Sequence, residues 1–377
     1  MTRVKVSRLI IGIILIISLV ACSNKAILPE LTDTQTPLPA NRQDQTESIL
    51  TITGNNPEET PTNREYLEEV EVIPLKLPER ISAASFEYSG MGWFGDYMVL
   101  LPQYPEGKDF SRKPNLFAIA KQDLLAAITD PDLELPVRDI PIENSDLRSV
   151  IKGFEGFESI LFVDQNVYMT IESRAGDPMM GYLIRGVVNG DLESITLDVN
   201  SLVELRPFSS ELNATFEGMT YWNGSLYVMY EHNSMRNVKQ PVAYQINPDL
   251  ENIREIPFPV INYRITDATI SDVDGKFWVM NYFFPGDTHL AVDQDSLVEE
   301  YGEGKTYAEN DPVERLVQLQ IENDQISRID QPPTYLQLLD NDIARNWEGL
   351  VMLDNLGFLL ITDSFPGSVL GFCPILR

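Results

Sequence analysis

The chain has 377 residues, with 28 Lys and Arg against 57 Asp and Glu, which gives a formal net charge of −29. A surface this acidic repels the phosphates of nucleic acids, so a nucleic-acid partner is excluded. Hydrophobic residues make up 43% of the chain and charged residues 23%, which excludes wholesale disorder. Two Cys and two His are too few for a disulfide framework or for the usual zinc sites. Any bound metal must therefore use carboxylate and carbonyl oxygens, a donor set that favours calcium.

The first 21 residues have the pattern of a signal peptide. Three basic residues among the first eight precede the apolar run Leu9–Val20, which is too short for a comfortable membrane span. The run ends in Leu19-Val20-Ala21-Cys22, which resembles the lipobox of bacterial lipoproteins. The resemblance implies that Cys22 is diacylated and becomes the first residue of the mature chain, whereas the alternative is an ordinary signal peptide with a chance cysteine. We expect a lipid-anchored protein of the bacterial cell envelope that faces outside the cytoplasm.

Residues 22–65 are predicted to be a disordered tether. The part from 31 to 62 is rich in Thr, Pro, Asn, Gln and Glu. Such a segment buries too little apolar surface to offset its chain entropy. The folded domain is therefore expected over residues 66–377.

This domain contains a repeat of paired strands. The segments Phe157–Glu172 and Phe216–Glu231 each run from a Glu through an apolar strand, a turn and a second strand to another Glu, 14 positions after the first. Three weaker copies start at Ser89, Asp267 and Glu348. Strand pairs repeated in this way are typical of a β-propeller.

Further strand-like runs follow each pair: Asn115–Ala120 and Val137–Ile142, Tyr182–Val188 and Ser194–Leu197, Val242–Ile246 and Ile253–Pro257, Arg315–Gln320 and Gln325–Ile329, and Ser368–Phe372. The fifth pair has only one such run, and the spare strand Glu69–Leu75 can complete it. We therefore predict an all-β fold, a five-bladed β-propeller of four-stranded blades closed by the N-terminal strand. A six-bladed ring is the alternative, but it needs another motif between residues 282 and 347. An open two-sheet sandwich would not explain polar residues that recur at fixed offsets.

In a propeller the innermost strand of each blade lines the central channel. The five residues that start the repeats should therefore converge near one mouth: Ser89, Glu158, Glu217, Asp267 and Glu348. Carboxylates this close repel one another unless they take up protons or share a cation, so we predict that these residues hold calcium. The residues that end the repeats are predicted to form a second polar shell: Gln103, Glu172, Glu231, Asn281 and Asp363. The alternative is that both sets cap strands and bind neighbouring backbone amides.

The repeat resembles phytase-like and esterase-like propellers and the five-bladed calcium-dependent apyrases, which place a Ser, Glu, Glu, Ser, Glu set around a channel calcium. This chain departs from that set at the fourth position, where Asp267 stands. The segments Arg264–Thr269 and Arg345–Leu350 also resemble those of bacterial propeller proteins. The resemblance covers most of residues 80–373 and implies the architecture and a calcium ion. The nucleotide-binding segments of the apyrases have no counterpart that we recognise in this sequence.

Few residues are candidates for chemistry. His232 follows Glu231 and is expected at the mouth, either as an acid or base or as a hydrogen-bonded loop histidine. Arg174, Arg264 and Arg345 are expected in loops at the same mouth. There they would bind a carboxylate or phosphate of a ligand, or else neutralise the acidic ring itself. The segment 283–311 is predicted to overhang this mouth as a lid or partner-binding loop.

Two function classes remain open. The first is an envelope lipoprotein that binds a small molecule or an envelope protein at the calcium-containing mouth, as a monomer. The alternative is a calcium-dependent hydrolase of phosphoesters or related esters, in which the ion polarises the substrate and activates water. The sequence has neither a Gly-x-Ser-x-Gly elbow nor a Gly-rich phosphate loop, which favours the binding protein.

Overall fold

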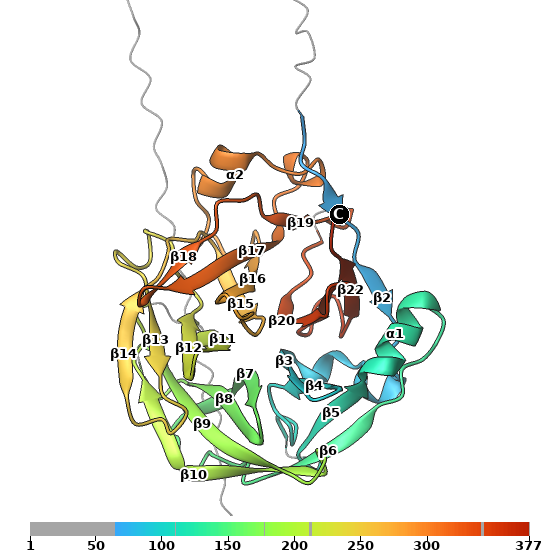
Figure 1. Ribbon diagram of the computed structural model, residues 1–377, viewed down its shortest axis with the longest axis vertical. Coiled ribbons are helices and arrows are strands. Elements are labelled where there is room, and N and C mark those ends of the chain that lie inside the picture. The colour runs from blue at the N-terminus through green and yellow to red at the C-terminus, as the bar shows by residue number, and fades with distance from the viewer. Residues whose placement is uncertain (1–64, 110, 177, 211–212, 341–342, 377) are drawn as a thin grey trace, which may run out of the picture. The chain divides into compact units, whose positions relative to one another are not determined.

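A computed structural model describes residues 65–109, 111–176, 178–210, 213–340 and 343–376. The predicted signal peptide, Cys22 and all of the tether except residue 65 lie outside these ranges. Strands make up nearly all of the regular secondary structure of the described residues (Figure 1), and none of their helices is long and apolar enough to cross a membrane. The longest helix among the described residues, α1 (Lys121–Thr129), has nine residues.

The strands form five groups of four around a central axis (Figure 1). The first group is β3 (Tyr88–Phe94), β4 (Tyr97–Pro102), β5 (Asn115–Ala120) and β6 (Arg138–Glu143), and the second is β7 (Phe154–Val163), β8 (Asn166–Ser173), β9 (Met180–Asn189) and β10 (Ser194–Leu205). Parallel pairing of β6 with β10 joins these two groups into one eight-stranded sheet. The third group is β11 (Phe216–Trp222), β12 (Ser225–Tyr230), β13 (Val242–Ile246) and β14 (Ile253–Pro257).

The fourth and fifth groups carry the additions to this plan. The fourth is β15 (Arg264–Ala268), β16 (Lys276–Phe283), β17 (Val313–Glu322) and β18 (Gln325–Arg328), with β19 (Thr334–Leu336) also paired to β17. The segment between β16 and β17 contains the helix α2 (Ser296–Tyr301). The fifth is β20 (Trp347–Leu353), β21 (Gly357–Thr362) and β22 (Leu370–Pro374), completed by β2 (Ile73–Leu75).

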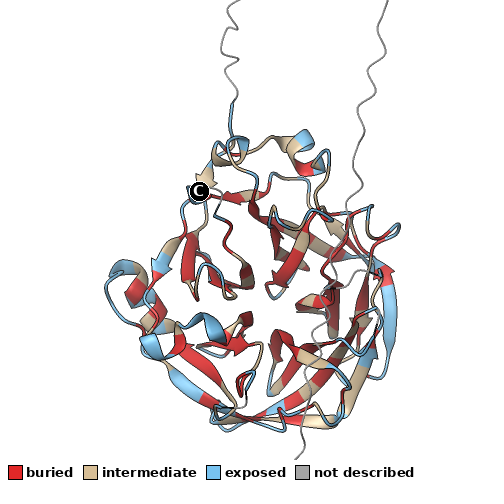
Figure 2. Ribbon diagram, turned by 180° about the vertical axis from the view of Figure 1, so that it is seen from behind, coloured by how far each residue is buried: buried red, intermediate tan, exposed pale blue. Residues whose placement is uncertain are grey.

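The innermost strands close a ring. Each inner strand contacts the next one around the ring: β3 contacts β7, β7 contacts β11, β11 contacts β15, and β15 contacts β20. Contacts between β20 and β3 close the ring. Buried residues concentrate in these inner strands, while the outer strands carry the exposed ones (Figure 2). The all-β propeller predicted from the sequence is confirmed.

The N-terminal segment divides between two groups, which corrects the single outer strand predicted over Glu69–Leu75. Its second half, β2, pairs antiparallel with β22 as the outer strand of the fifth group. Its first half, β1 (Glu69–Val70), instead pairs in parallel with β19 of the fourth group. Where the segment passes from the fourth group to the fifth, Val70 and Val72 are buried in the apolar cluster that the two groups share. This burial favours pairing of the segment with both groups.

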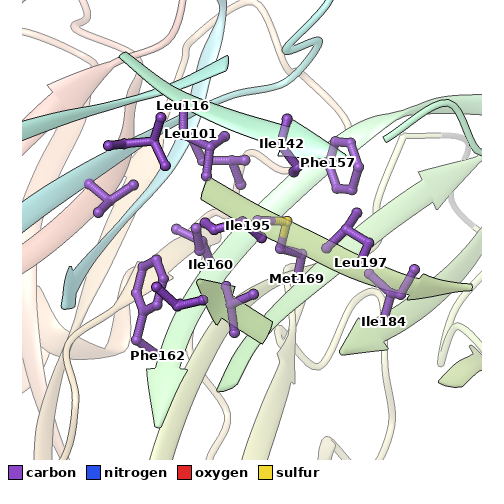
Figure 3. Packing of buried hydrophobic residues seen from close by; sticks show 14 of the residues in the cluster. Leu101, Leu116, Ile142, Phe157, Ile160, Phe162, Met169, Ile184, Ile195 and Leu197 are labelled. Carbon is purple, nitrogen blue, oxygen red and sulfur yellow. The ribbon is translucent and has the colours of Figure 1, made fainter. Parts of the chain in front are cut away.

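Apolar side chains fill the spaces between neighbouring groups. The largest cluster lies between the first and second groups and includes Leu101, Phe157, Met169 and Ile184 (Figure 3). Along the axis, apolar residues of four inner strands, among them Met91, Ile160 and Val351, leave a gap of about 30 Å³. A gap of this size is too small for an organic ligand.

Candidate functional site

Each of the five inner strands carries a β-bulge near its start. The pairing register with the second strand skips one residue in four of the five groups, and in β7 it skips two, Glu155 and Glu158. We call one skipped residue from each inner strand the bulge ring: Ser89, Glu158, Glu217, Thr266 and Glu348. A bulged residue has no partner across the ladder, so its backbone bends and its side chain is re-aimed.

The two hydroxyl members of the bulge ring lock neighbouring groups together. Ser89 Oγ donates to the carbonyl of Phe157 at 2.6 Å, and Thr266 Oγ1 donates to the carbonyl of Trp347 at 2.5 Å. Each acceptor immediately precedes a bulged glutamate, Glu158 or Glu348. The same bond therefore ties the first group to the second and the fourth group to the fifth.

Asp267, predicted as a metal ligand, has a different role. Its carboxylate accepts the backbone N–H groups of Ala268 and Leu350, both at 2.7 Å, and a third bond comes from the N–H of Met91. It is 1% exposed and does not line the cavity at the mouth. The bulge shifts the equivalent position by one residue, so Thr266 is the fourth member of the ring and Asp267 ties three inner strands together behind it.

A cavity of about 380 Å³ opens at this mouth, and Ser89, Glu158, Glu217 and Glu348 of the bulge ring line it. Its other carboxylates are Glu87, Glu172, Asp287 and Asp363. One arginine, Arg264, is the only cationic side chain among the described lining residues. The cavity is therefore strongly negative, which favours a cation over an anion.

The pKa values of the ring carboxyls reflect this crowding. Burial raises the pKa of Glu158 well above its ordinary value, and the nearby Glu172 carboxylate raises it further. Burial and neighbouring carboxylates also raise the pKa of Glu217 and of Glu348. The Oε2 atom of Glu217 is buried and has no hydrogen-bond partner in the described part of the chain. These carboxyls are therefore costly to ionise without a cation.

Three of the five predicted second-shell residues line the cavity. Gln103 Nε2 donates to Oε1 of Glu158 at 2.8 Å and to Oε1 of Glu172 at 3.2 Å, and so holds the two carboxyls together. Burial raises the pKa of Glu172 to about 7. Burial also raises the pKa of Asp363, although Ser364 Oγ donates to its Oδ2 at 2.9 Å.

The other two second-shell predictions are corrected. Asn281 is buried away from the cavity, because its amide donates to the carbonyls of Asn262 and Arg264 and accepts from Arg315. Glu231 is also buried outside the cavity and forms an ion pair with Arg264. Burial acts to raise the pKa of Glu231, but Arg264 and His232 outweigh it and lower that pKa to about 2.

His232 does not reach the cavity. Its side chain is 1% exposed, and Nε2 lies 3.6 Å from Oε1 of Glu231. Neither ring nitrogen has a hydrogen-bond partner among the described residues. The prediction of an acid or base at the mouth, and that of a hydrogen-bonded loop histidine, both disagree with this placement.

Of the three arginines predicted to bind a ligand, one lines the cavity. Arg264 does so while its guanidinium is shared between Glu231 and Asp287, with Asp287 Oδ2 at 3.0 Å from Nη2. Arg345 is buried elsewhere, where Nη2 lies 2.7 Å from Oε2 of Glu314. This ion pair, which the sequence did not suggest, removes Arg345 from the ligand-facing surface.

Arg174 is half-exposed beside the cavity rather than in its lining. It lies 3.3 Å from Glu155 and donates to Oδ1 of Asn213 at 2.8 Å, and Asn213 is a lining residue. All three arginines therefore bind acids or amides of the chain itself.

The insertion between β16 and β17 contributes to the mouth only through its first residues. Phe284 and Asp287 line the cavity, and Phe365, from the loop after β21, lines it too. Further along, Asp295 binds Arg315 at 2.6 Å, which holds the insertion against the fourth group instead of over the mouth. Phe284 belongs to the segment 283–311 that was predicted at the mouth, whereas no pattern in the sequence pointed to Phe365.

The donor atoms of the bulge ring match calcium better than a transition metal, because carboxylate and hydroxyl oxygens are hard donors. The unpartnered oxygen of Glu217 is an open ligand position. In the described ranges, however, no three His, Cys, Asp or Glu side chains lie close enough together to hold an ion directly. A calcium ion here would therefore need the two hydroxyls or water to complete its shell.

No protein-family model and no curated protein sequence matches this chain. Similar solved structures include a GH32 β-fructofuranosidase from Bombyx mori, at 9% identity and a TM-score of 0.44, with 81% of this chain and 61% of that chain covered. An α-L-arabinanase from Cellvibrio cellulosa has 8% identity and a TM-score of 0.41, over 80% and 91%. A soluble aldose sugar dehydrogenase from Escherichia coli has 10% identity and a TM-score of 0.40, over 81% and 100%.

Proposed function

We propose that this protein binds a calcium ion at the bulge ring and uses the acidic cavity above it to bind a ligand. The observation that carries the proposal is the ring itself. Five bulges at equivalent places re-aim two hydroxyls and three glutamates on neighbouring strands, and one buried glutamate oxygen has no partner in the described part of the chain.

The order of residues in the ring supports calcium. With Thr266 in place of Asp267 the order becomes hydroxyl, Glu, Glu, hydroxyl, Glu, which is the order of the apyrase set. Of the ring residues that line the cavity, Glu158, Glu217 and Glu348 would supply negative charge to the ion and Ser89 a neutral oxygen. Thr266 does not line the cavity, so water would complete the shell of the ion. Bound calcium would offset both the burial and the repulsion that raise the pKa of all three glutamates.

Ligand binding without chemistry is better supported than hydrolysis. His232 is buried outside the cavity, and Arg264 is already neutralised by two carboxylates. The described lining residues thus lack both a histidine and a cation free to stabilise a phosphoryl group. The proposed role is a calcium-containing binding protein.

Thermal denaturation with added calcium tests the proposal. Calcium that binds only the folded state raises the free energy of unfolding by about 2.7 kcal/mol at a hundredfold excess over Kd. We expect this increase in the unaltered protein and a smaller one with magnesium, whose small octahedral shell fits a wide ring of mixed donors less well. Glu217→Gln and Glu348→Gln should abolish most of the increase.

The matched control is Glu322→Gln, at an exposed position at the end of β17. It should respond to calcium as the unaltered protein does. If a chelator leaves the melting temperature unchanged and calcium does not raise it, the ring glutamates only cap their strands and the proposal is wrong.

The lipid anchor is a further part of the proposal, and it places the binding protein at the cell envelope. Cys22→Ser should release the protein from the membrane fraction or leave an unprocessed precursor. Fractionation and the size of the mature chain check this, and no change in either would contradict the anchor.

A further inference from the structure

The rim of the cavity identifies the class of ligand, an inference that rests on the proposed ligand-binding function. Two acids that line the cavity, Glu172 and Asp363, have no ion-pair partner among the described residues. Arg264 forms ion pairs with Glu231 and Asp287. A phosphate or carboxylate ligand would have to compete with these acids for the arginine, so the rim disfavours anions.

Two phenylalanines stand exposed at the same rim. Phe284 is 46% exposed and Phe365 is 53% exposed, and both line the cavity. Large apolar side chains that stay exposed around a polar cavity mark a binding surface. Carboxylates attract metal ions and ammonium groups alike. Aromatic faces in addition attract organic ammonium groups, so their presence here favours an ammonium ligand over a metal ion.

The ring of Phe284 and the backbone of Phe365 are held in place by the chain. The Phe284 ring packs on Gly286, where an added Cβ would lie 2.2 Å from the ring, and the N–H of Asp287 donates to the Phe284 carbonyl at 2.9 Å. Asp287 in turn binds Arg264, so this turn is anchored to β15. The carbonyl of Phe365 accepts the N–H of Asn346, another lining residue, at 3.2 Å.

The size of the cavity completes the argument. At about 380 Å³ it is much larger than one metal ion and falls within the range of small-molecule sites. We propose that the outer cavity binds an organic ammonium compound, with its charged nitrogens on Glu172 and Asp363 and its apolar part against Phe284 and Phe365.

Calorimetric titration of the full chain with 1,4-diaminobutane tests this inference. 1,4-Butanediol, of similar shape but uncharged, and inorganic phosphate are the comparison probes. We expect binding of the diamine alone. Phe284→Ala and Phe365→Ala should each weaken it about tenfold, the loss expected for one ammonium–aromatic contact.

Two further variants sharpen the test. Gly286→Ala should displace the Phe284 ring and also weaken diamine binding, whereas Tyr66→Ala, at an exposed aromatic outside the cavity lining, should not. All four variants should keep the calcium response of the unaltered protein, which also shows that they fold.

The outcomes separate the two proposals. If calcium binds but the diamine binds no better than the diol, the ligand class is wrong and the calcium proposal stands. If the diamine binds equally well to both phenylalanine variants, or if phosphate binds instead, the ligand class is again wrong. If neither calcium nor the diamine binds, both proposals fail.

Discussion

Asp267→Ala should lower the free energy of unfolding by roughly 3 kcal/mol or more. The carboxylate accepts N–H groups from Met91 on β3, Ala268 on β15 and Leu350 on β20, so it joins the first, fourth and fifth groups at the axis. Removing it leaves three buried donors without a partner, and each such donor costs about 1–3 kcal/mol. Urea denaturation of the calcium-free protein measures the loss.

The control is Asp132→Ala, at an exposed position in the loop after α1, for which a change within about 0.5 kcal/mol is expected. This experiment also decides between the two readings of Asp267. If Asp267→Ala is as stable as the control without calcium but has lost the calcium response, Asp267 is the ligand that the repeat pattern suggested and the bulge alignment is wrong.

The calcium-free protein should become less stable as the pH rises from about 4.5 to 7. Glu172 has a pKa of about 7 in the folded state against an ordinary value of 4.5. Between these values the folded state binds more protons than the unfolded state, so the contribution of Glu172 to stability falls as the pH rises and levels off above about 7. A shift of this size corresponds to roughly 3 kcal/mol. The raised pKa values of Glu158, Glu217 and Glu348 act in the same direction.

Denaturation at several pH values, with a chelator present, measures this dependence. Glu172→Gln should flatten the curve, and Glu134→Gln, at an exposed position, should leave it unchanged. Saturating calcium should reduce the slope, since a bound cation favours the ionised carboxylates. Stability that rises steadily from pH 5.5 to pH 8 without calcium would contradict the raised pKa values.

Most of the strand framework could be predicted from the sequence because it depends on local patterns. Asn115–Ala120, Val242–Ile246 and Ile253–Pro257 have the predicted bounds as β5, β13 and β14. Alternating apolar residues between turn residues are sufficient for such strands. The division of Glu69–Leu75 between two groups could not be predicted, since it depends on where Val70 and Val72 find a buried position.

The site was harder to predict because a bulge shifts by one residue which side chain occupies the equivalent position on each inner strand. In Arg264-Ile265-Thr266-Asp267 the acid is the obvious match to the glutamates of the other repeats, and no local pattern reveals that Thr266 is the bulged residue. Arg345 shows a second limit. Its partner Glu314 lies on β17, distant in sequence, and only the assembled fold brings the two together.

The number of calcium ions bound per chain shows directly whether the bulge ring holds one calcium ion. Equilibrium dialysis of the chelator-treated protein at pH 7.5, followed by elemental analysis, measures this number. We predict one calcium per chain for the unaltered protein and for Glu322→Gln, and close to none for Glu217→Gln and Glu348→Gln. If the unaltered protein binds no calcium, or if the Glu217→Gln protein binds the same amount, the bulge ring does not hold a calcium ion.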